Sequence, residues 1–135
     1  MAEKPCKCAM AATVPHTILV VEDEVLIRLM LADDLIQAGF QVIQAANAED
    51  ALKILQSSVK IDLVLTDIQM PGSLDGLDLA RRVRARWPGL KTLILSAQHA
   101  GPARSAADAF LSKPYRVAEL IDCVNQLLGG PNVKS

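Results

Sequence analysis

The sequence predicts a single α/β domain built on an open, doubly wound parallel sheet. Its 135 residues leave room for one hydrophobic core. Short, continuous apolar runs recur along the chain, and longer segments with helical periodicity separate them. Continuous apolar runs are typical of strands that helices cover on both faces, as in a parallel sheet.

Five short apolar segments are the expected strands. They cover residues 18–21, 41–43, 61–65, 92–95 and, more weakly, 109–111. Runs of this length suit buried strands better than buried helices. Because the carboxyl ends of parallel strands share one edge, and doubly wound sheets bind their ligands there, that edge is the place to look for chemistry.

The segments between the strands have the spacing and the ends of helices. Gly39 stands where a C-terminal cap belongs, and Asn47 with Asp50 opens a second helix in the manner of a capping box. Only twelve residues, 97–108, lie between the last two expected strands, so the fourth helix is expected to be short. The other expected helices cover residues 24–38, 76–86 and 117–128.

The ends of the chain differ from its middle. Residues 1–16 lack strand or helical periodicity and are expected to form a flexible leader, followed by one domain over 17–128 and a tail over 129–135. No apolar run approaches the roughly 20 residues that span a bilayer, and the leader lacks the apolar run of a signal peptide. The three cysteines indicate neither a disulfide framework nor a zinc site. A soluble, cytoplasmic protein is expected.

Composition narrows the classes of partner. The formal net charge is −1 and aromatic residues make up 3% of the chain. A nucleic-acid binder usually carries a basic footprint, and a stacking platform needs several aromatic rings. Four arginines between residues 81 and 86 are interpreted as a solvated helix face. We therefore expect no direct nucleic-acid binding and no membrane contact.

Charged and hydroxyl side chains follow the expected strands. Each alone has an ordinary interpretation as a helix cap or a turn residue. Their coincidence at one edge of the sheet predicts a functional site. The residues are Glu22 and Asp23 after the first strand, Asp67 after the third, Ser96 after the fourth and Lys113 after the fifth.

The charges of this group predict a metal ion. Three carboxylates against one ammonium leave a net charge of −2, which is unfavourable at short distances. Oxygen ligands without His or Cys suit a hard cation, and Mg²⁺ is commonly held by one or two carboxylates together with phosphate oxygens and waters. A carboxylate beside such an ion can attack phosphorus to form an aspartyl phosphate. Asp67 is the expected nucleophile.

The strings that contain these residues resemble the receiver domain of two-component response regulators. The similarity runs from about Thr17 to Leu128 in the family's order. It implies a flavodoxin-like, five-stranded parallel sheet of order 2-1-3-4-5 with helices on both faces. The strings are ILVVEDE at 18–24, DLVLTDIQMPG at 62–72, DGLDLAR at 75–81, LSA at 95–97 and FLSKP at 110–114.

The resemblance also implies roles for the acidic residues. Asp67 takes the place of the phospho-acceptor, and Asp23 and Asp67 those of the direct Mg²⁺ ligands. The main-chain carbonyl of Gln69 would complete the protein ligands, with Glu22 as an outer-shell acid. A histidine kinase or a histidine phosphotransfer protein is the implied phosphodonor.

The remaining motif residues resemble the switch of the family. Ser96 takes the place of the switching hydroxyl and Phe110 that of the aromatic switch. Lys113 takes the place of the cation that pairs with the phosphoryl oxygens after transfer, and a cis peptide is implied before Pro114. The implied function is a phosphorylation-dependent signalling switch that acts on an unknown downstream protein, not an enzyme beyond self-catalysed phosphorylation and dephosphorylation.

Alternative functions on the same fold stay open. A degenerate receiver would bind partners without being phosphorylated, although the intact Asp23, Asp67 and Lys113 argue against it. A phosphatase with an aspartyl nucleophile would need a second Asp where Gln69 stands. A nucleotide or flavin module would be expected to carry a glycine-rich phosphate loop, and the seven glycines form none.

Overall fold

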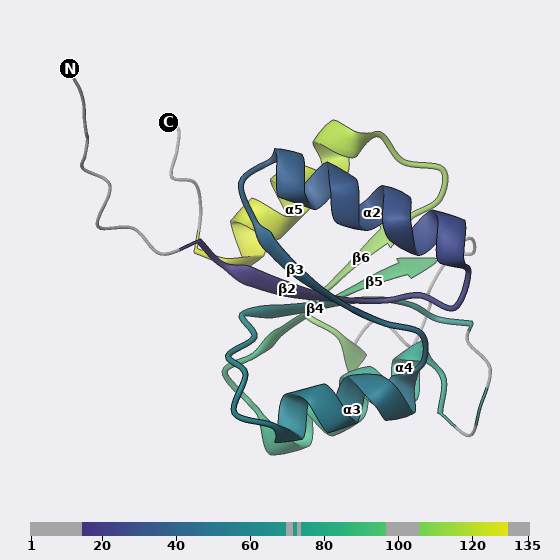
Figure 1. Cartoon of the computed structure of the whole chain (residues 1–135), viewed down its shortest axis with the longest axis vertical. Coiled ribbons are helices and arrows are strands. Elements are labelled where there is room, and N and C mark those ends of the chain that lie inside the picture. Colours follow the sequence, from purple (N-terminus) through teal and green to yellow (C-terminus); the bar gives the residue numbers. More distant parts are fainter. Residues whose placement is uncertain (1–14, 70–71, 73, 97–105, 130–135) are drawn as a thin grey trace.

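The computed structural model describes residues 15–69, 72, 74–96 and 106–129, which form a sheet with helices on both faces (Figure 1). Within these residues the strands and helices alternate along most of the chain. In order they are β2 (Thr17–Val21), α2 (Val25–Gln37), β3 (Gln41–Ala45), α3 (Ala48–Gln56), β4 (Leu63–Asp67), α4 (Gly76–Arg86), β5 (Lys91–Ser96), β6 (Ala109–Ser112) and α5 (Val117–Leu127).

The five strands form one parallel sheet in the order β3-β2-β4-β5-β6. Counted along the chain this is the order 2-1-3-4-5, so the predicted topology is confirmed. The order reverses between β2 and β4, and open α/β sheets bind their ligands at the carboxyl edge beside such a switch point. The predicted acids of β2 and β4 lie on either side of this switch point.

Among the described helices, α2 and α5 cover one face of the sheet, and α3 and α4 cover the other (Figure 1). Leu35 of α2 and Leu120 of α5 pack on one side of β2, against Ile18. On the other side, Leu19 packs with α3 and α4, which contribute Leu55 among other residues. Alternate residues of a strand face opposite sides, and both sides are buried here. This explains why the strands read as continuous apolar runs.

The strand ends differ from the predicted ones, with consequences for the site. We predicted a strand over 61–65, but β4 begins at Leu63 and ends at Asp67. The main-chain N–H of Asp62 donates to the carbonyl of Thr17 at 2.8 Å, and its carboxylate accepts from the Thr17 N–H at 2.8 Å, before the strand begins. Ladder pairing then continues past the apolar run, with Asp67 opposite Leu95. Asp67, the predicted nucleophile, was expected after the strand, but it is the last residue of β4 and takes part in the pairing with β5.

The helix ends agree better with the sequence. The helix predicted over 76–86 is observed as α4, Gly76–Arg86. The side chain of Asn47 accepts a hydrogen bond from the Asp50 N–H at 2.7 Å, and Gly39 has φ +102° after α2. A reciprocal capping box between Asp75 and Asp78 opens α4, which we did not predict from the sequence.

Several predictions fall on other parts of the chain. The short helix predicted within 97–108 lies almost wholly outside the described residues, as do nearly all of the leader and the tail. The peptide bond between Lys113 and Pro114 is cis, as the resemblance implied. Of the helices described, none is long and apolar enough to cross a membrane.

Candidate functional site

The predicted site residues meet at the carboxyl edge of the sheet. The ammonium of Lys113 contacts the Asp67 carboxylate at 2.7 Å, although 46 positions separate them in the sequence. The main-chain N–H of Lys113 donates to the carbonyl of Ser96 at 2.7 Å, which fixes the end of β6 beside the end of β5. Lys113, which the resemblance predicts to pair with phosphoryl oxygens after transfer, contacts Asp67 directly in this structure.

This ion pair is partly shielded from water. The Asp67 side chain is 18% exposed and that of Lys113 is 29% exposed. An N–H···O contact of this length between charged groups is a strong hydrogen bond. The lysine therefore holds the Asp67 carboxylate in place, while the remaining exposure leaves that carboxylate accessible from solvent.

Glu22, which follows β2, is 2% exposed. Its pKa is raised to about 7: burial is the largest cause, a hydrogen bond with the Asp23 side chain and the charges of Asp67 and Asp23 also raise it, and a hydrogen bond from the Glu24 N–H lowers it. An unfolded Glu loses its proton near pH 4.5, so this carboxyl lowers the stability as the pH rises from there towards 7.

The charges of these acidic residues indicate whether a metal ion would fit between them. Burial is the main cause of the raised pKa of Glu22, and the negative charges of Asp67 and Asp23 contribute to it. When Glu22, Asp23 and Asp67 are all ionised, Lys113 alone leaves an excess of negative charge. A divalent cation would remove this excess and release the proton. In the part of the chain that the structure describes, no three acidic, His or Cys groups could by themselves hold an ion. A site with two carboxylates and other oxygens, as Mg²⁺ uses, agrees with this.

Gly76 packs closely against the main chain at Asp67 and Ile68. The N–H of Gly76, the first residue of α4, donates to the carbonyl of Ile68 at 2.7 Å. A Cβ at Gly76 would lie 1.9 Å from the main-chain oxygen of Asp67, so no other residue fits without a shift of the backbone. The start of α4 thus fixes the end of β4, which carries Asp67. The sequence marked Gly76 only as a helix start, because its close approach to Asp67 arises from the tertiary fold.

The two predicted switch residues lie on β5 and β6. Ser96 is buried at the last position of β5 and pairs in register with Ser112. Phe110 is half-buried and packs against Ala80 of α4 and Ile94 of β5. The aromatic side chain therefore lies under α4 and beside the strand that ends in Ser96. Their switching roles stay predictions.

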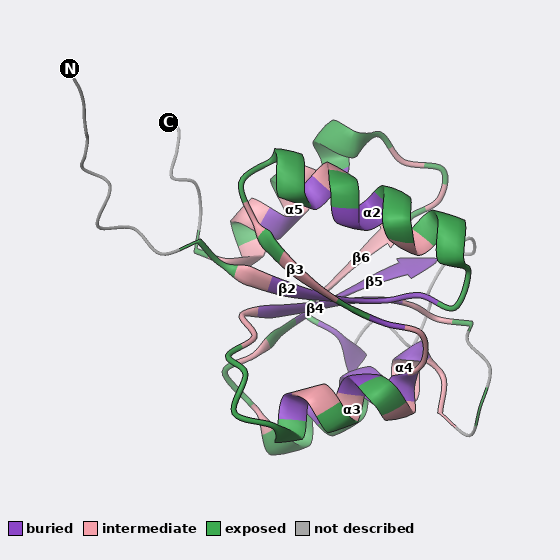
Figure 2. Cartoon of the chain, in the orientation of Figure 1, coloured by how far each residue is buried: buried purple, intermediate pink, exposed green. Residues whose placement is uncertain are grey.

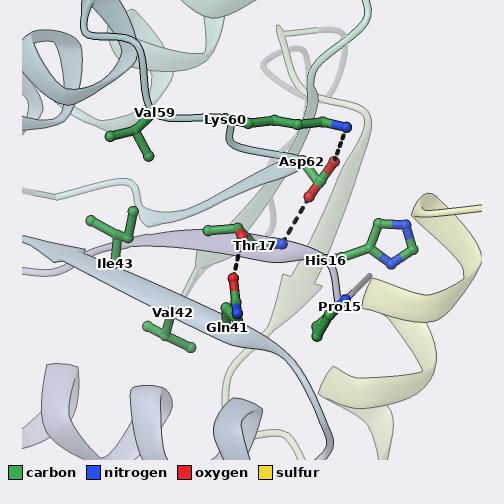
Figure 3. Close-up of a pocket in the computed structure, with 9 residues that line it drawn as sticks. All are labelled: Pro15, His16, Thr17, Gln41, Val42, Ile43, Val59, Lys60 and Asp62. Atoms are coloured by element: carbon green, nitrogen blue, oxygen red, sulfur yellow. Dashed lines mark hydrogen bonds and ion pairs between the residues drawn. The ribbon is translucent and has the colours of Figure 1, made fainter. Parts of the chain in front are cut away.

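A cavity of about 620 Å³ lies at the opposite, amino edge of the sheet (Figure 3). It is lined by residues at the starts of β2, β3 and β4. Its polar side chains bind one another: the Thr17 hydroxyl contacts Gln41 at 3.2 Å, and Lys60 lies 4.0 Å from Asp62. The Thr17–Gln41 bond joins the starts of β2 and β3, and the bond from the Thr17 N–H to Asp62 joins β2 to the segment before β4, so we assign this region a structural role.

Comparison with known proteins identifies the family. The response regulator receiver domain matches residues 18–125 of this chain. The chain belongs to this family. The receiver is 33% identical over 120 residues to the DNA-binding transcriptional regulator NtrC of Bradyrhizobium sp., covering 85% of this chain and 25% of NtrC. It spans about half the length, or less, of the first curated relatives it matches.

Solved receivers have the same fold. The response regulator TrrA of Thermotoga maritima, solved in complex with Mg²⁺-BeF, is 36% identical with a TM-score of 0.77, covering 84% of this receiver and 99% of TrrA. TrrA in complex with the histidine kinase ThkA is 37% identical at the same TM-score and coverage. The family and the fold class predicted from the motifs are both confirmed.

Proposed function

We propose that this receiver is a phosphorylation-dependent signalling switch in which Asp67 accepts a phosphoryl group from a phosphohistidine. The observation that carries the proposal is the contact between Asp67 and Lys113 near the acid pair of buried Glu22 and exposed Asp23. It places a carboxylate nucleophile and a cation at the edge where an α/β sheet of this order binds ligands. The complex of the similar TrrA with a histidine kinase supports this type of donor.

The chemistry is an in-line transfer. A carboxylate oxygen of Asp67 attacks phosphorus, the P–N bond to the donor imidazole breaks, and the imidazole leaves with the bonding electrons. The Lys113 ammonium, released from the carboxylate it now holds, pairs with an equatorial phosphoryl oxygen. Ser96, at the end of β5, is the proposed hydroxyl partner of another phosphoryl oxygen. Bound Mg²⁺ supplies neutralisation of the charge that builds on these oxygens.

The proposed metal ligands are the carboxylates of Asp23 and Asp67 and the main-chain carbonyl of Gln69, with Glu22 as an outer-shell acid. The Mg²⁺-BeF complex of TrrA supports the choice of metal. Gln69 has no acid–base capacity, so the chain offers no group at that position to hydrolyse an aspartyl phosphate repeatedly. We therefore propose an acceptor and not a turnover phosphatase, working in the reducing cytoplasm and acting on another protein.

Removal of the metal tests this function. We expect an acyl phosphate plus Mg²⁺ to add one phosphoryl group to the protein, seen by intact-mass spectrometry, and a chelator to abolish the addition. The ion is needed because the acidic pocket otherwise repels the donor's charge. Equal incorporation with and without chelator would exclude the proposed metal role. No incorporation in either case would favour a degenerate receiver that only binds partners.

The proposed docking surface for the donor lies on α2, which begins two residues after Asp23. Leu26 is 74% exposed and Met30 is 66% exposed, and Val25 and Leu29 beside them are about half exposed. Figure 2 shows the exposed outer side of this helix. Large apolar side chains gathered on one surface indicate an interaction site. Because α2 begins two residues after Asp23, at the edge of the sheet that carries Asp67, this surface suits the protein that carries the phosphohistidine.

Substitution on α2 separates docking from chemistry. We expect Leu26→Asp to slow phosphotransfer from the cognate kinase or phosphotransfer protein by about tenfold, the effect of losing about 1.4 kcal/mol of binding. Phosphorylation by a small acyl phosphate should be unchanged, since Leu26 does not contact the nucleophile. Val59→Asp, at an exposed apolar residue near the amino edge, is the matched control. Equal slowing with both donors, or by the control, would contradict docking on α2.

A further inference from the structure

An arginine of α2 turns back onto the acid pair. Arg28 is half-buried in the second turn of the helix. Its Nη1 donates to the main-chain carbonyl of Glu22 at 2.8 Å, and its Nε donates to the side-chain oxygen of Gln44 on β3 at 3.2 Å. One side chain thus joins α2, the end of β3 and the residue after β2.

The bond to Glu22 fixes a particular peptide group. The N–H of Glu22 still donates to the carbonyl of Ala45, as the last bond of the β2–β3 pairing, at 3.1 Å. Its carbonyl accepts from Arg28 and belongs to the peptide that also contains the N–H of Asp23. Because a peptide group is planar, a bond that holds this oxygen also sets the direction in which Asp23 leaves the strand. A charged donor makes the bond stronger than a neutral one.

We infer that Arg28 is a positioning residue for metal binding: it holds the Glu22–Asp23 peptide so that the Asp23 carboxylate faces the ion. The inference rests on the proposed metal site of Asp23 and Asp67. Gln44 supports it by occupying the Nε of the guanidinium, which leaves the fork aimed at Glu22. No sequence motif marks Arg28, because its partner at Glu22 is a main-chain atom.

The direction in which Mg²⁺ affinity changes on removal of Arg28 distinguishes a positioning role from an effect of its charge. A guanidinium beside an acidic pocket repels a cation, so if Arg28 acted by charge alone, its removal would tighten Mg²⁺ binding. If Arg28 positions Asp23, its removal weakens binding. Groups that orient metal ligands typically contribute 10- to 100-fold to affinity, and we expect about tenfold here because a main-chain contact is indirect.

The test is a calorimetric Mg²⁺ titration of the full chain. We expect Arg28→Met to raise the Kd about tenfold, and Arg28→Lys, which keeps the charge but not the fork, to raise it less. Gln44→Leu, which keeps Arg28 but removes its partner on β3, should also raise the Kd. Arg82→Met, on the exposed side of α4, is the control and should match wild type.

A second readout needs no metal. In chelator, the amide resonance of Asp23 should shift in Arg28→Met and stay in place in Arg82→Met, because only the former releases the peptide. If Arg28→Met does not fold, Gln44→Leu decides the matter. An unchanged or tighter Kd in Arg28→Met and Gln44→Leu, with wild type binding normally, would overturn the role of Arg28. Equal titrations of wild type and Asp23→Ala would overturn the proposed metal site itself, and this inference with it.

Discussion

Asp67→Asn is expected to lose phosphoryl incorporation completely while keeping the fold. The amide has nearly the shape of the carboxylate but no charge with which to attack phosphorus. It also removes one negative charge from a pocket in which the pKa of Glu22 is raised. We therefore expect no large decrease in the stability of the folded protein. The measurement is intact-mass spectrometry after incubation with an acyl phosphate and Mg²⁺, with circular dichroism to verify folding.

The matched control for this experiment is Asp33→Asn, on the exposed side of α2, where the carboxylate accepts a hydrogen bond from Gln37 at 2.7 Å. It should gain the same mass as wild type. Mass addition on Asp67→Asn at the level of the control would show that another residue accepts the phosphoryl group. The assignment of the nucleophile would then be wrong, although the family and the fold would stand.

Gly76→Ala is expected to destabilise the domain strongly and to displace the nucleophile. Alanine is the better helix former by about 1 kcal/mol. However, its Cβ would lie 1.9 Å from the main-chain oxygen of Asp67, and hydrogen bonds hold the main chain at this point, so it cannot move away easily. Overpacking of this kind costs about 3 kcal/mol. The clash outweighs the propensity, and the Tm should fall by about 10 °C.

Gly89→Ala is the control, since a Cβ there meets no atom within 4 Å. It should leave the Tm nearly unchanged. Phosphorylation of Gly76→Ala, measured below its Tm, should also be slower than that of the control, because the shift moves the end of β4. A Tm equal to that of the control would mean that the contact between Gly76 and Asp67 is looser than the structure indicates.

The sequence by itself determined most of the fold. Strands buried on both faces must be apolar at every position, so their positions could be read directly, and helix ends carry local signals such as Asn47 and Gly39. The strand ends were less certain, because ladder pairing with neighbours continues beyond the apolar run. Asp67 was therefore predicted after its strand, whereas the pairing with β5 makes it the last strand residue.

The sequence also determined which residue types gather at the site. Acids, a hydroxyl and a lysine at strand ends meet because parallel strands end at one edge, and this required no knowledge of side-chain contacts. Only the tertiary structure decided how they are held. Lys113 already pairs with Asp67, Glu22 keeps a proton through burial, Gly76 touches the strand end, and Arg28 binds the Glu22 carbonyl. These contacts depend on distance, burial and main-chain atoms brought together by folding, which leave no periodic or local signal along the chain.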